Sequence, residues 1–461
     1  MDDNKMATKP INRLFWSMGL PMVFSMVLQA LYNVVDTVFI INMGETGIKA
    51  NLALTYVFPV QIFMIAVGVG TGIGINALLS RGLGEKDQKK IGLILGNGIF
   101  LGLCLYLIFL LFGLFASKWF MSIQTNDEEI IRMGSEYLSI VTTLSFGAIG
   151  FNVFERFLQA TGKTMHSTIS QVVGALINIV LDYVFIYPLN MGVDGAAYAT
   201  VIGQIASLLV AVLFHYLLNK EAKHSFKDII PDIKIIGSIY KVAWAAMLMQ
   251  ALLSINMFVM IKVFSINPDG DLINGTYGIY YKIQQIALFS CFGLSNTIIS
   301  LLSFNIGLND KMRIKECIKW GIIDTVIVAG IITILFEVLA GPIANLFGLT
   351  TSGENKEQII NLCQTSIRIA SIGYVFMGVS LAIQGILQAY RKSVTPLIIS
   401  LLRLIVLLVP FALLFVNNNN AVNLVWWSFP IAELLTAIIS LFILFKHGKS
   451  YSKRGHDTFD Y

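Results

Sequence analysis

Charged residues are scarce in this chain of 461 residues, because Asp, Glu, Lys and Arg together make up 13% of it. A soluble domain carries about a quarter charged residues, so the composition excludes an ordinary soluble globular protein. Hydrophobic residues reach 56%, and the mean hydropathy is +0.75. The shortage of charge therefore points to a protein that lives in an apolar environment.

Cysteine and histidine are also rare, and their spacing excludes the usual metal and disulfide patterns. The four cysteines show no CxxC pair, and the five histidines do not cluster. The segment "ATGKT" at 160–164 resembles the end of a P-loop, but that motif needs glycine where Phe157 stands. No constellation of catalytic His, Ser or Cys is present either. We therefore predict no enzyme, no cofactor and no ATP-driven mechanism.

Long apolar blocks dominate the chain. Runs of about 18 or more apolar residues predict membrane-spanning helices, and the blocks do not alternate as the strands of a barrel would. The start, "MDDNKMATKP", is polar, and the run after it is too long for a cleaved signal. The sequence thus predicts an all-α integral membrane protein with twelve transmembrane helices, near 13–41, 51–79, 91–116, 130–160, 165–187, 195–218, 236–266, 273–303, 314–347, 358–388, 394–416 and 421–446.

Basic residues gather in every second loop. The side that holds the amino terminus has 22 Lys and Arg residues, and the opposite side has 4. Because basic loops stay in the cytoplasm, we predict a multi-pass protein of the cell (inner or plasma) membrane with both termini cytoplasmic. The same bias explains the net charge of +5, so no nucleic-acid partner is needed.

The chain repeats itself once. Residues 61–90 align with 284–313 at an offset of 223, and 157–169 align with 386–398 at an offset of 229. The first offset pairs Ser80 with Ser303, Gly84 with Gly307 and Asp87 with Asp310. Six spans per half give both halves the same orientation, as in transporters whose repeats are related by an axis along the membrane normal. We predict an N-lobe at 1–218, a cytoplasmic linker at 219–234, a C-lobe at 235–447 and a cytoplasmic tail at 448–461.

Three acids, Asp36, Glu155 and Asp182, lie inside predicted spans of the first half. An ionised carboxylate near the centre of a bilayer is costly, and such groups usually serve function. Their counterparts in the second half are Val259, Gln384 and Phe411, so the scaffold does not need acids at these positions. The acids are therefore candidates for a functional site.

Polar residues accompany each of these acids at helical spacing. Two close carboxylates would tend to retain a proton, whereas amide and hydroxyl oxygens would complete a shell for Na⁺. The residues alone therefore leave H⁺ and Na⁺ open as the ion bound. The three stripes are Gln29, Asn33 and Asp36; Asn152, Glu155 and Gln159; and Asn178 with Asp182.

Several segments together resemble the multidrug and toxic compound extrusion (MATE) transporters over essentially the whole chain. They are "LSRGLGEKD" after span two, "LQATGKT" after span four and "GVDGAAYAT" opening span six. The resemblance implies an antiporter that couples entry of H⁺ or Na⁺ to export of amphiphilic, cationic organic compounds, by alternating access between two lobes. Its expected partners are small organic molecules and the lipid bilayer, and we expect a monomer.

The resemblance also assigns roles to residues. It places cation coupling at Asp36, Asn152, Asn178, Asp182 and Thr200, with Na⁺, if used, at Asp36, Asn178 and Asp182. Glu155 looks like an acid of the firmicute-type multidrug members, and the candidates for the substrate cavity are Gln29, Tyr32, Asn33, Glu155 and Gln159. Pro21 resembles the proline at which the first helix of the family bends. Its plainer interpretation is a tolerated kink in a membrane helix.

The second half departs from some members, because spans seven, eight and ten hold no carboxylate. This departure argues against a cation site there. Two arginines of the second half, Arg368 and Arg403, lie within spans, and the candidate partners are Asp324, Glu337 and Glu433.

An alternative function within the same superfamily is a flippase for a lipid-linked saccharide. Arg156, Arg368 and Arg403 would then face phosphates. A channel or a lipid-modifying enzyme is disfavoured, because the short loops leave no room for a catalytic domain.

Overall fold

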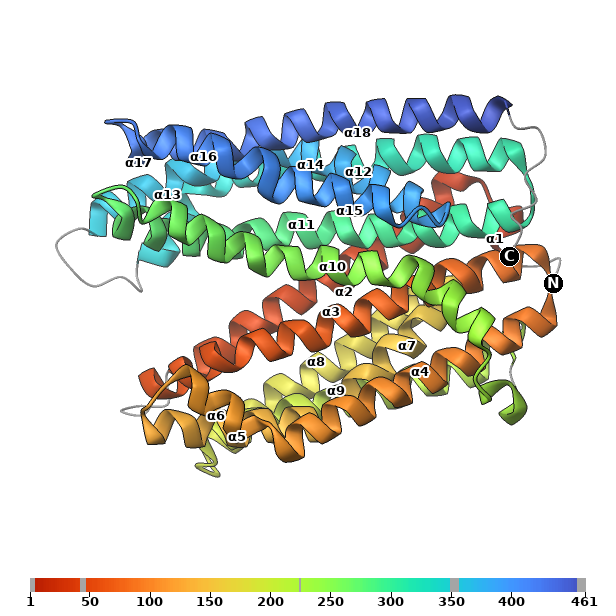
Figure 1. Ribbon diagram of the computed structural model, residues 1–461, viewed down its shortest axis with the longest axis horizontal. Helices are drawn as coiled ribbons and strands as arrows, with labels where there is room; N and C mark the ends of the chain where they lie inside the picture. The colour runs from red at the N-terminus through yellow and green to blue at the C-terminus, as the bar shows by residue number, and fades with distance from the viewer. Residues whose placement is uncertain (1–4, 42–46, 224, 349–355, 454–461) are drawn as a thin grey trace. The chain divides into compact units, whose positions relative to one another are not determined.

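The computed structural model describes residues 5–41, 47–223, 225–348 and 356–453, and every regular element in these ranges is a helix (Figure 1). Ten of the described helices are long and apolar enough to cross a membrane. Two further spans are pairs of helices bent at a short break, which brings the number to as many as twelve. The predicted all-α membrane fold is confirmed.

The chain divides into two compact units. The first comprises residues 1–251, 296–317 and 388–393. Its complete spans follow in chain order: α2 (Ile11–Ile41), α3 (Gly47–Glu85), α4 (Gln88–Phe115), the bent pair α6 (Glu128–Thr143) and α7 (Phe146–Ala160), α8 (Thr164–Ile186) and α9 (Gly192–Leu218). Its short helices are α1 (Lys5–Thr8), α5 (Ser117–Gln124) and η2 (Phe226–Ile229).

The second unit comprises residues 252–295, 318–387 and 394–461. Three long helices belong partly to each unit: α10 (Ile233–Phe264), α11 (Gly270–Gly307) and α12 (Lys311–Gly348). The remaining helices are the bent pair α13 (Lys356–Ser371) and α14 (Gly373–Ala389); α15 (Val394–Leu401), η3 (Leu402–Leu407) and α16 (Leu408–Val416), which together form one span; and α17 (Ala421–Leu424), η4 (Val425–Trp427) and α18 (Ser428–Lys453).

Two spans that we predicted as continuous, 130–160 and 358–388, are broken. The helices of the first pair meet at 43° and those of the second at 44°. Before the first break, the hydroxyls of Thr142 and Thr143 each donate to a backbone carbonyl one turn earlier, at 2.6 Å. Before the second, Ser371 Oγ donates to the carbonyl of Arg368 at 3.0 Å. Such bonds compete with the helix ladder and bend helices.

The turns of the two halves adopt the same unusual backbone conformation at positions that the repeat aligns. Lys86 (φ 58°) corresponds to Asn309 (φ 57°), and Gly162 (φ 77°) corresponds to Arg391 (φ 58°). A positive φ is uncommon for residues other than glycine. The matching turns therefore support the internal repeat that the sequence predicts.

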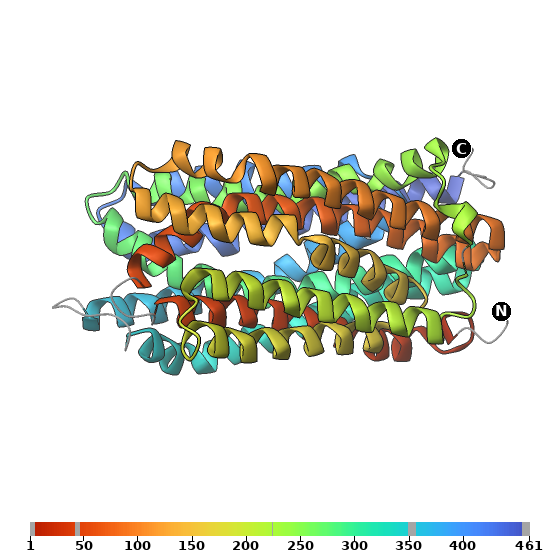
Figure 2. The same ribbon diagram turned by 90° about the horizontal axis from the view of Figure 1, so that it is seen from below.

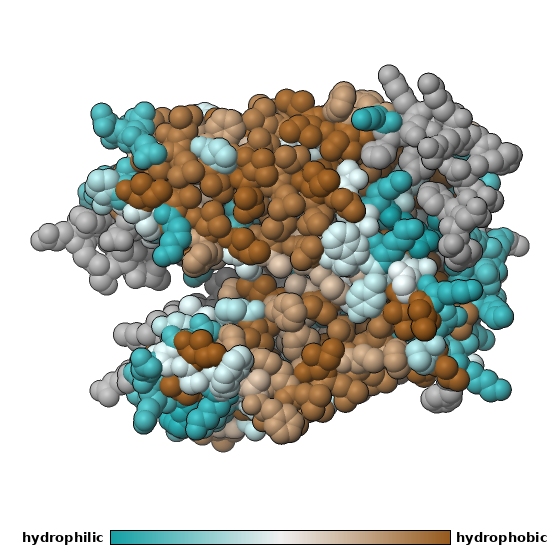
Figure 3. All heavy atoms as spheres, in the orientation of Figure 1, coloured by the Kyte–Doolittle hydropathy of each residue, from teal (hydrophilic) through white to brown (hydrophobic). Residues whose placement is uncertain are grey.

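The visible surface is apolar in its middle part in both units, and hydrophilic residues gather toward the ends (Figure 3). Large apolar side chains are exposed along whole helix faces, such as Leu107 and Leu111 on α4 and Ile334 and Val338 on α12. An apolar surface this extensive marks contact with a membrane or a partner. With spans of this length, lipid is the environment that it fits.

The polar segment after α9 is docked on α4 rather than free. The Oδ1 atom of Asn97 accepts a hydrogen bond from the backbone N–H of Asp232 at 2.8 Å. Gly96 provides the space, because a Cβ atom there would lie 2.1 Å from the carbonyl oxygen of Asp228. The segment thus belongs to the first unit up to the start of α10.

Candidate functional site

Asp182 and Asn178 form the centre of the buried polar site on α8. Their residues are 1% and 3% exposed. The Nδ2 atom of Asn178 donates a hydrogen bond to Asp182 Oδ2 at 3.1 Å. The i, i+4 spacing predicted this shared face, and the hydrogen bond shows that the two side chains meet on it.

Helix α9 packs closely on this face of α8 (Figures 1 and 2). A Cβ atom on Gly203 would lie 2.8 Å from the Cβ of Asn178, and one on Gly174 would lie 1.8 Å from Ser207 Oγ. Small residues let helix backbones approach in membranes. Thr200 is buried one turn before Gly203, so it shares the α9 face that turns toward Asn178.

A second polar group, centred on Glu155, lies on α7. Gln159 Nε2 donates to Glu155 Oε1 at 2.9 Å, and Arg156 Nη1 donates to Gln159 Oε1 at 2.7 Å. Arg156 Nε lies 3.9 Å from Glu155 Oε2, and all three residues are buried. Gly72 of α3 leaves room for the arginine, since a Cβ there would lie 2.9 Å from Arg156 Cγ. The acid is therefore electrostatically balanced by a buried guanidinium.

The sequence did not lead us to predict that Arg156 pairs with Glu155, because we considered Arg156 only as a phosphate contact for a flippase. The signal was present: a basic residue next to a buried acid and one turn before Gln159.

Asn152 lies on the side of α7 that meets α3. Its Nδ2 donates to the carbonyl of Ala148 at 2.9 Å. The same atom would lie 3.4 Å from a Cβ atom added to Gly68 of α3. Asn152 and Glu155 thus form hydrogen bonds within α7, whereas Asn178 and Asp182 lie where α8 meets α9. The predicted set therefore divides into an α7 group and an α8–α9 group.

Helix α8 also holds α2 at its proline. Thr168 Oγ1 donates to the carbonyl oxygen of Pro21 at 2.7 Å, and Ser25 Oγ donates to Gln171 Oε1. Proline removes a backbone donor from the helix ladder, so this part of α2 is its weakest. Four candidates on α2 have side chains outside the described part of the structure: Gln29, Tyr32, Asn33 and Asp36.

The charged residues of the second unit are distributed unevenly. Glu433 pairs with Arg403, and Ser371 Oγ donates to Glu337 Oε1 at 3.1 Å. Arg368 is exposed, and Asp324 is buried with 2% of its surface accessible. Of the proposed partners for the arginines, Glu433 is therefore the one that the structure pairs.

A membrane protein with as many as twelve spans and an internal repeat has the architecture of a membrane transporter. A family model described as MatE matches residues 21–184 and 245–414. The chain belongs to the MatE family, the multidrug and toxic compound extrusion (MATE) transporters.

Relatives and solved structures agree with this family. The chain is 24% identical over 430 residues to the multidrug export protein MepA of Staphylococcus saprophyticus, covering 93% of this chain and 92% of that protein. It is similar in fold to a multidrug resistance MATE transporter of the MOP superfamily in an outward-facing conformation, with TM-score 0.91, 21% identity and coverage of 98% and 99%. A MATE structure in a bent conformation gives TM-score 0.87 at 20% identity, with coverage of 98% and 99%.

Proposed function

We propose that this chain is an antiporter that exports amphiphilic, cationic organic compounds in exchange for H⁺ or Na⁺. Membership of the MATE family and similarity to a multidrug export protein support the export of drug-like molecules. The single observation that carries the coupling is the burial of Asp182 between two membrane helices. A carboxylate there is tolerable when a cation neutralises it and costly when none does.

The α8–α9 group supplies the chemistry of cation exchange. Asn178 stabilises the carboxylate of Asp182 by donating a hydrogen bond. The amide oxygen of Asn178 and the hydroxyl of Thr200 add oxygen ligands on the same interface, the type that hard cations prefer. A proton would instead bind the carboxylate directly. Either cation neutralises the same group, so either can be exchanged for an organic cation.

Bending of α2 links this site to alternating access. Pro21 weakens the helix, and the hydrogen bond from Thr168 ties that point to α8, the helix that carries Asp182. A change in the occupancy of Asp182 can thereby be transmitted to α2 along α8.

The flippase alternative is less well supported. It needs arginines that are available to phosphates. Arg368 is exposed, but Arg156 lies 3.9 Å from Glu155 and Arg403 lies 3.8 Å from Glu433. Both guanidinium groups therefore face buried acids. No second function is proposed.

The test is efflux of tetraphenylphosphonium from proteoliposomes with an imposed pH or Na⁺ gradient, alongside equilibrium binding of the same cation. The wild-type chain should drive uphill efflux with one of the two gradients. Asp182→Asn mimics the neutral form in shape, so it should keep part of the binding and lose uphill efflux. Full efflux by this variant, or efflux that neither gradient affects, would refute the proposal.

A further inference from the structure

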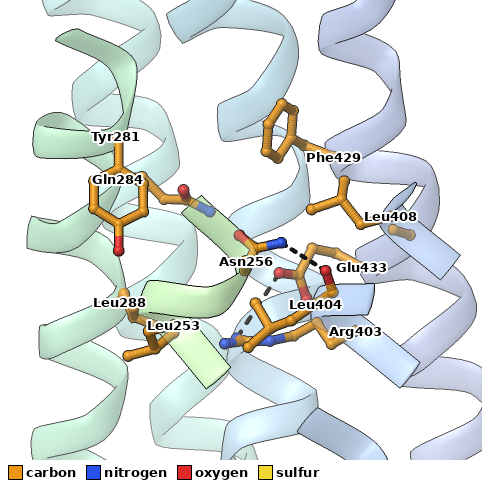
Figure 4. Close-up of a pocket in the computed structure, with 11 residues that line it drawn as sticks. Leu253, Asn256, Tyr281, Gln284, Leu288, Arg403, Leu404, Leu408, Phe429 and Glu433 are labelled. Atoms are coloured by element: carbon orange, nitrogen blue, oxygen red, sulfur yellow. Dashed lines mark hydrogen bonds and ion pairs between the residues drawn. The ribbon is translucent and has the colours of Figure 1, made fainter. Parts of the chain in front are cut away.

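A small, mostly apolar cavity lies inside the second unit, around the charged pair formed by Arg403 and Glu433 (Figure 4). Its wall comes from four parts of the chain: α10, α11, the η3–α16 segment and α18. Besides apolar side chains, it is lined by Asn256, Tyr281 and Gln284. Figure 4 shows the two charged side chains directed at each other, with Asn256 beside them.

The pair is loosely joined for one so deeply buried. Arg403 Nη1 lies 3.8 Å from Glu433 Oε1, which is beyond hydrogen-bond distance. The two residues are 3% and 8% exposed. Among the residues that the structure describes, no hydrogen-bond partner exists for Arg403 Nε, Arg403 Nη1 or Glu433 Oε2. Buried charges normally require such partners. These atoms can therefore form hydrogen bonds with a further molecule in the cavity.

The cavity is large enough for a molecule that could form these hydrogen bonds. The volume of the cavity is about 20 Å³, which is enough for about one water molecule. The opposite charges of the guanidinium and the carboxylate largely cancel for an ion placed beside both, so neither a cation nor an anion gains much there. The species that fits is a water molecule, which can bring a proton to the carboxylate.

The helix that carries Arg403 is itself irregular. Residues Leu402–Leu407 form a π-helix, a rare segment found often at functional sites. Asn256 Nδ2 of α10 donates to the carbonyl of Leu404 at 2.6 Å and so fixes this segment in place. A return of this segment to α-helix would remove one residue from the wide turn. The side chains on one side of that turn would then rotate about the helix axis by about 100°, the angle per residue of an α-helix. Such a change would withdraw Arg403 from Glu433.

We propose that Glu433 is a proton-exchange site of the second unit, distinct from the acids of the first. Arg403 stabilises its ionised form while the guanidinium faces it, and Glu433 takes a proton from the cavity water when η3 changes register and the guanidinium withdraws. Arg403 then meets the amide oxygens of Asn256 and Gln284. Arginine keeps its charge throughout, so the exchanged proton resides on Glu433.

The other titratable groups around Glu433 leave this assignment intact. Tyr280 and Cys291 of α11 and Tyr374 of α14 lie within electrostatic reach of it. Gly373 at the start of α14 packs against its stem, since a Cβ there would lie 3.5 Å from Glu433 Cγ. A phenol and a thiol are weaker acids than a carboxyl group. Glu433 is therefore the strongest acid among them and the group that exchanges a proton most readily.

The test measures the protonation of Glu433 directly, without transport. The purified full-length chain is treated with dicyclohexylcarbodiimide, which modifies carboxyl groups in apolar surroundings through their acid form, at a series of pH values. Mass spectrometry then quantifies the adduct on Glu433. We expect an adduct that increases as the pH falls. At neutral pH, Arg403→Met and Asn256→Leu should each increase it several-fold, because the first removes the guanidinium and the second removes the hydrogen bond that fixes η3.

Two controls keep the result interpretable. Arg403→Lys retains the charge and should label like the wild type, and it also serves if Arg403→Met does not fold. Asp324, a buried acid of the same unit, should label to the same extent in all variants. Absence of an adduct on Glu433 in the wild type at low pH would overturn the proposal. So would labelling of Glu433 that neither pH nor the Arg403 and Asn256 substitutions alter.

Discussion

Gly84 and Gly307, which occupy the same position in the two halves of the repeat, touch each other. A Cβ atom added to either would lie 3.0 Å from the Cα of the other. Both glycines belong to the first unit. The end of α3 and the end of α11 therefore meet, within that unit, at positions that the repeat aligns.

This contact predicts that Gly84→Ala is destabilising. The new Cβ would lie 2.0 Å from the carbonyl oxygen of Phe304, and backbone atoms cannot move aside cheaply. Overpacking of this kind costs about 1–3 kcal/mol, so the melting temperature of the purified protein should fall. Gly82→Ala is the matched control, because its nearest neighbours are side-chain atoms at 3.6 Å. Equal melting temperatures for the two variants would contradict the close contact.

The two halves should contribute unequally to coupling. We expect Asp324→Asn to lower gradient-driven efflux less than Asp182→Asn at equal expression, because Asp182 accepts a hydrogen bond from Asn178 and is buried on α8. Efflux of ethidium from energised cells provides the measurement, with immunoblots to match protein levels. A larger loss in Asp324→Asn would place the coupling site in the other half.

The bond between Thr168 and the Pro21 carbonyl should matter for both stability and transport. Thr168→Val removes the hydroxyl at almost constant volume and leaves that carbonyl without this donor. A loss of about 0.5–1.5 kcal/mol is typical for one hydrogen bond. We expect a lower melting temperature and slower efflux, and Thr168→Ser should restore both. A valine variant that transports like the wild type would show that the tie to α8 is dispensable.

Lys5, outside the membrane spans, predicts a pH dependence of stability. Burial, together with the nearby ammonium groups of Lys163 and Lys9, lowers its pKa below the ordinary value of 10.5. The folded chain thus holds this proton less tightly than the unfolded chain, which disfavours folding below that pH. Lys5→Gln should melt at a higher temperature than the wild type at pH 7, and the difference should shrink toward pH 10.5. Lys89→Gln, at an exposed position, should show no such difference.

The orientation in the membrane is tested by labelling. We predict that 81–90 faces the cytoplasm and 417–420 faces outward, from the 22 and 4 basic residues on the two sides. Single cysteines in these loops, in a chain without its native cysteines, should differ in intact cells. An impermeant maleimide should reach the second loop and leave the first unlabelled. The reverse pattern would invert the topology.

Spans and repeat were readable from the sequence because length, hydropathy and alignment are local properties of the chain. The pairing of Asn178 with Asp182 was also readable, since i, i+4 neighbours on one helix must meet. The pairing of Arg403 with Glu433 crosses between spans and depends on a π-segment that no hydropathy pattern reveals. The bends after Thr143 and Ser371 follow hydroxyls that donate back to their own helix. Thr325 and Thr436 make the same kind of bond within continuous helices, so neither composition nor these bonds locate the bends.

The segment after α9 is anchored to α4, so it is not a flexible connection. Fastened to α4 at Asn97, the segment has no slack between Asp232 and α10, which begins at Ile233. One crossing of the chain between the two compact units falls between Ala251 and Leu252, in the middle of α10. At this crossing the units are joined by a continuous helix and not by a loose tether.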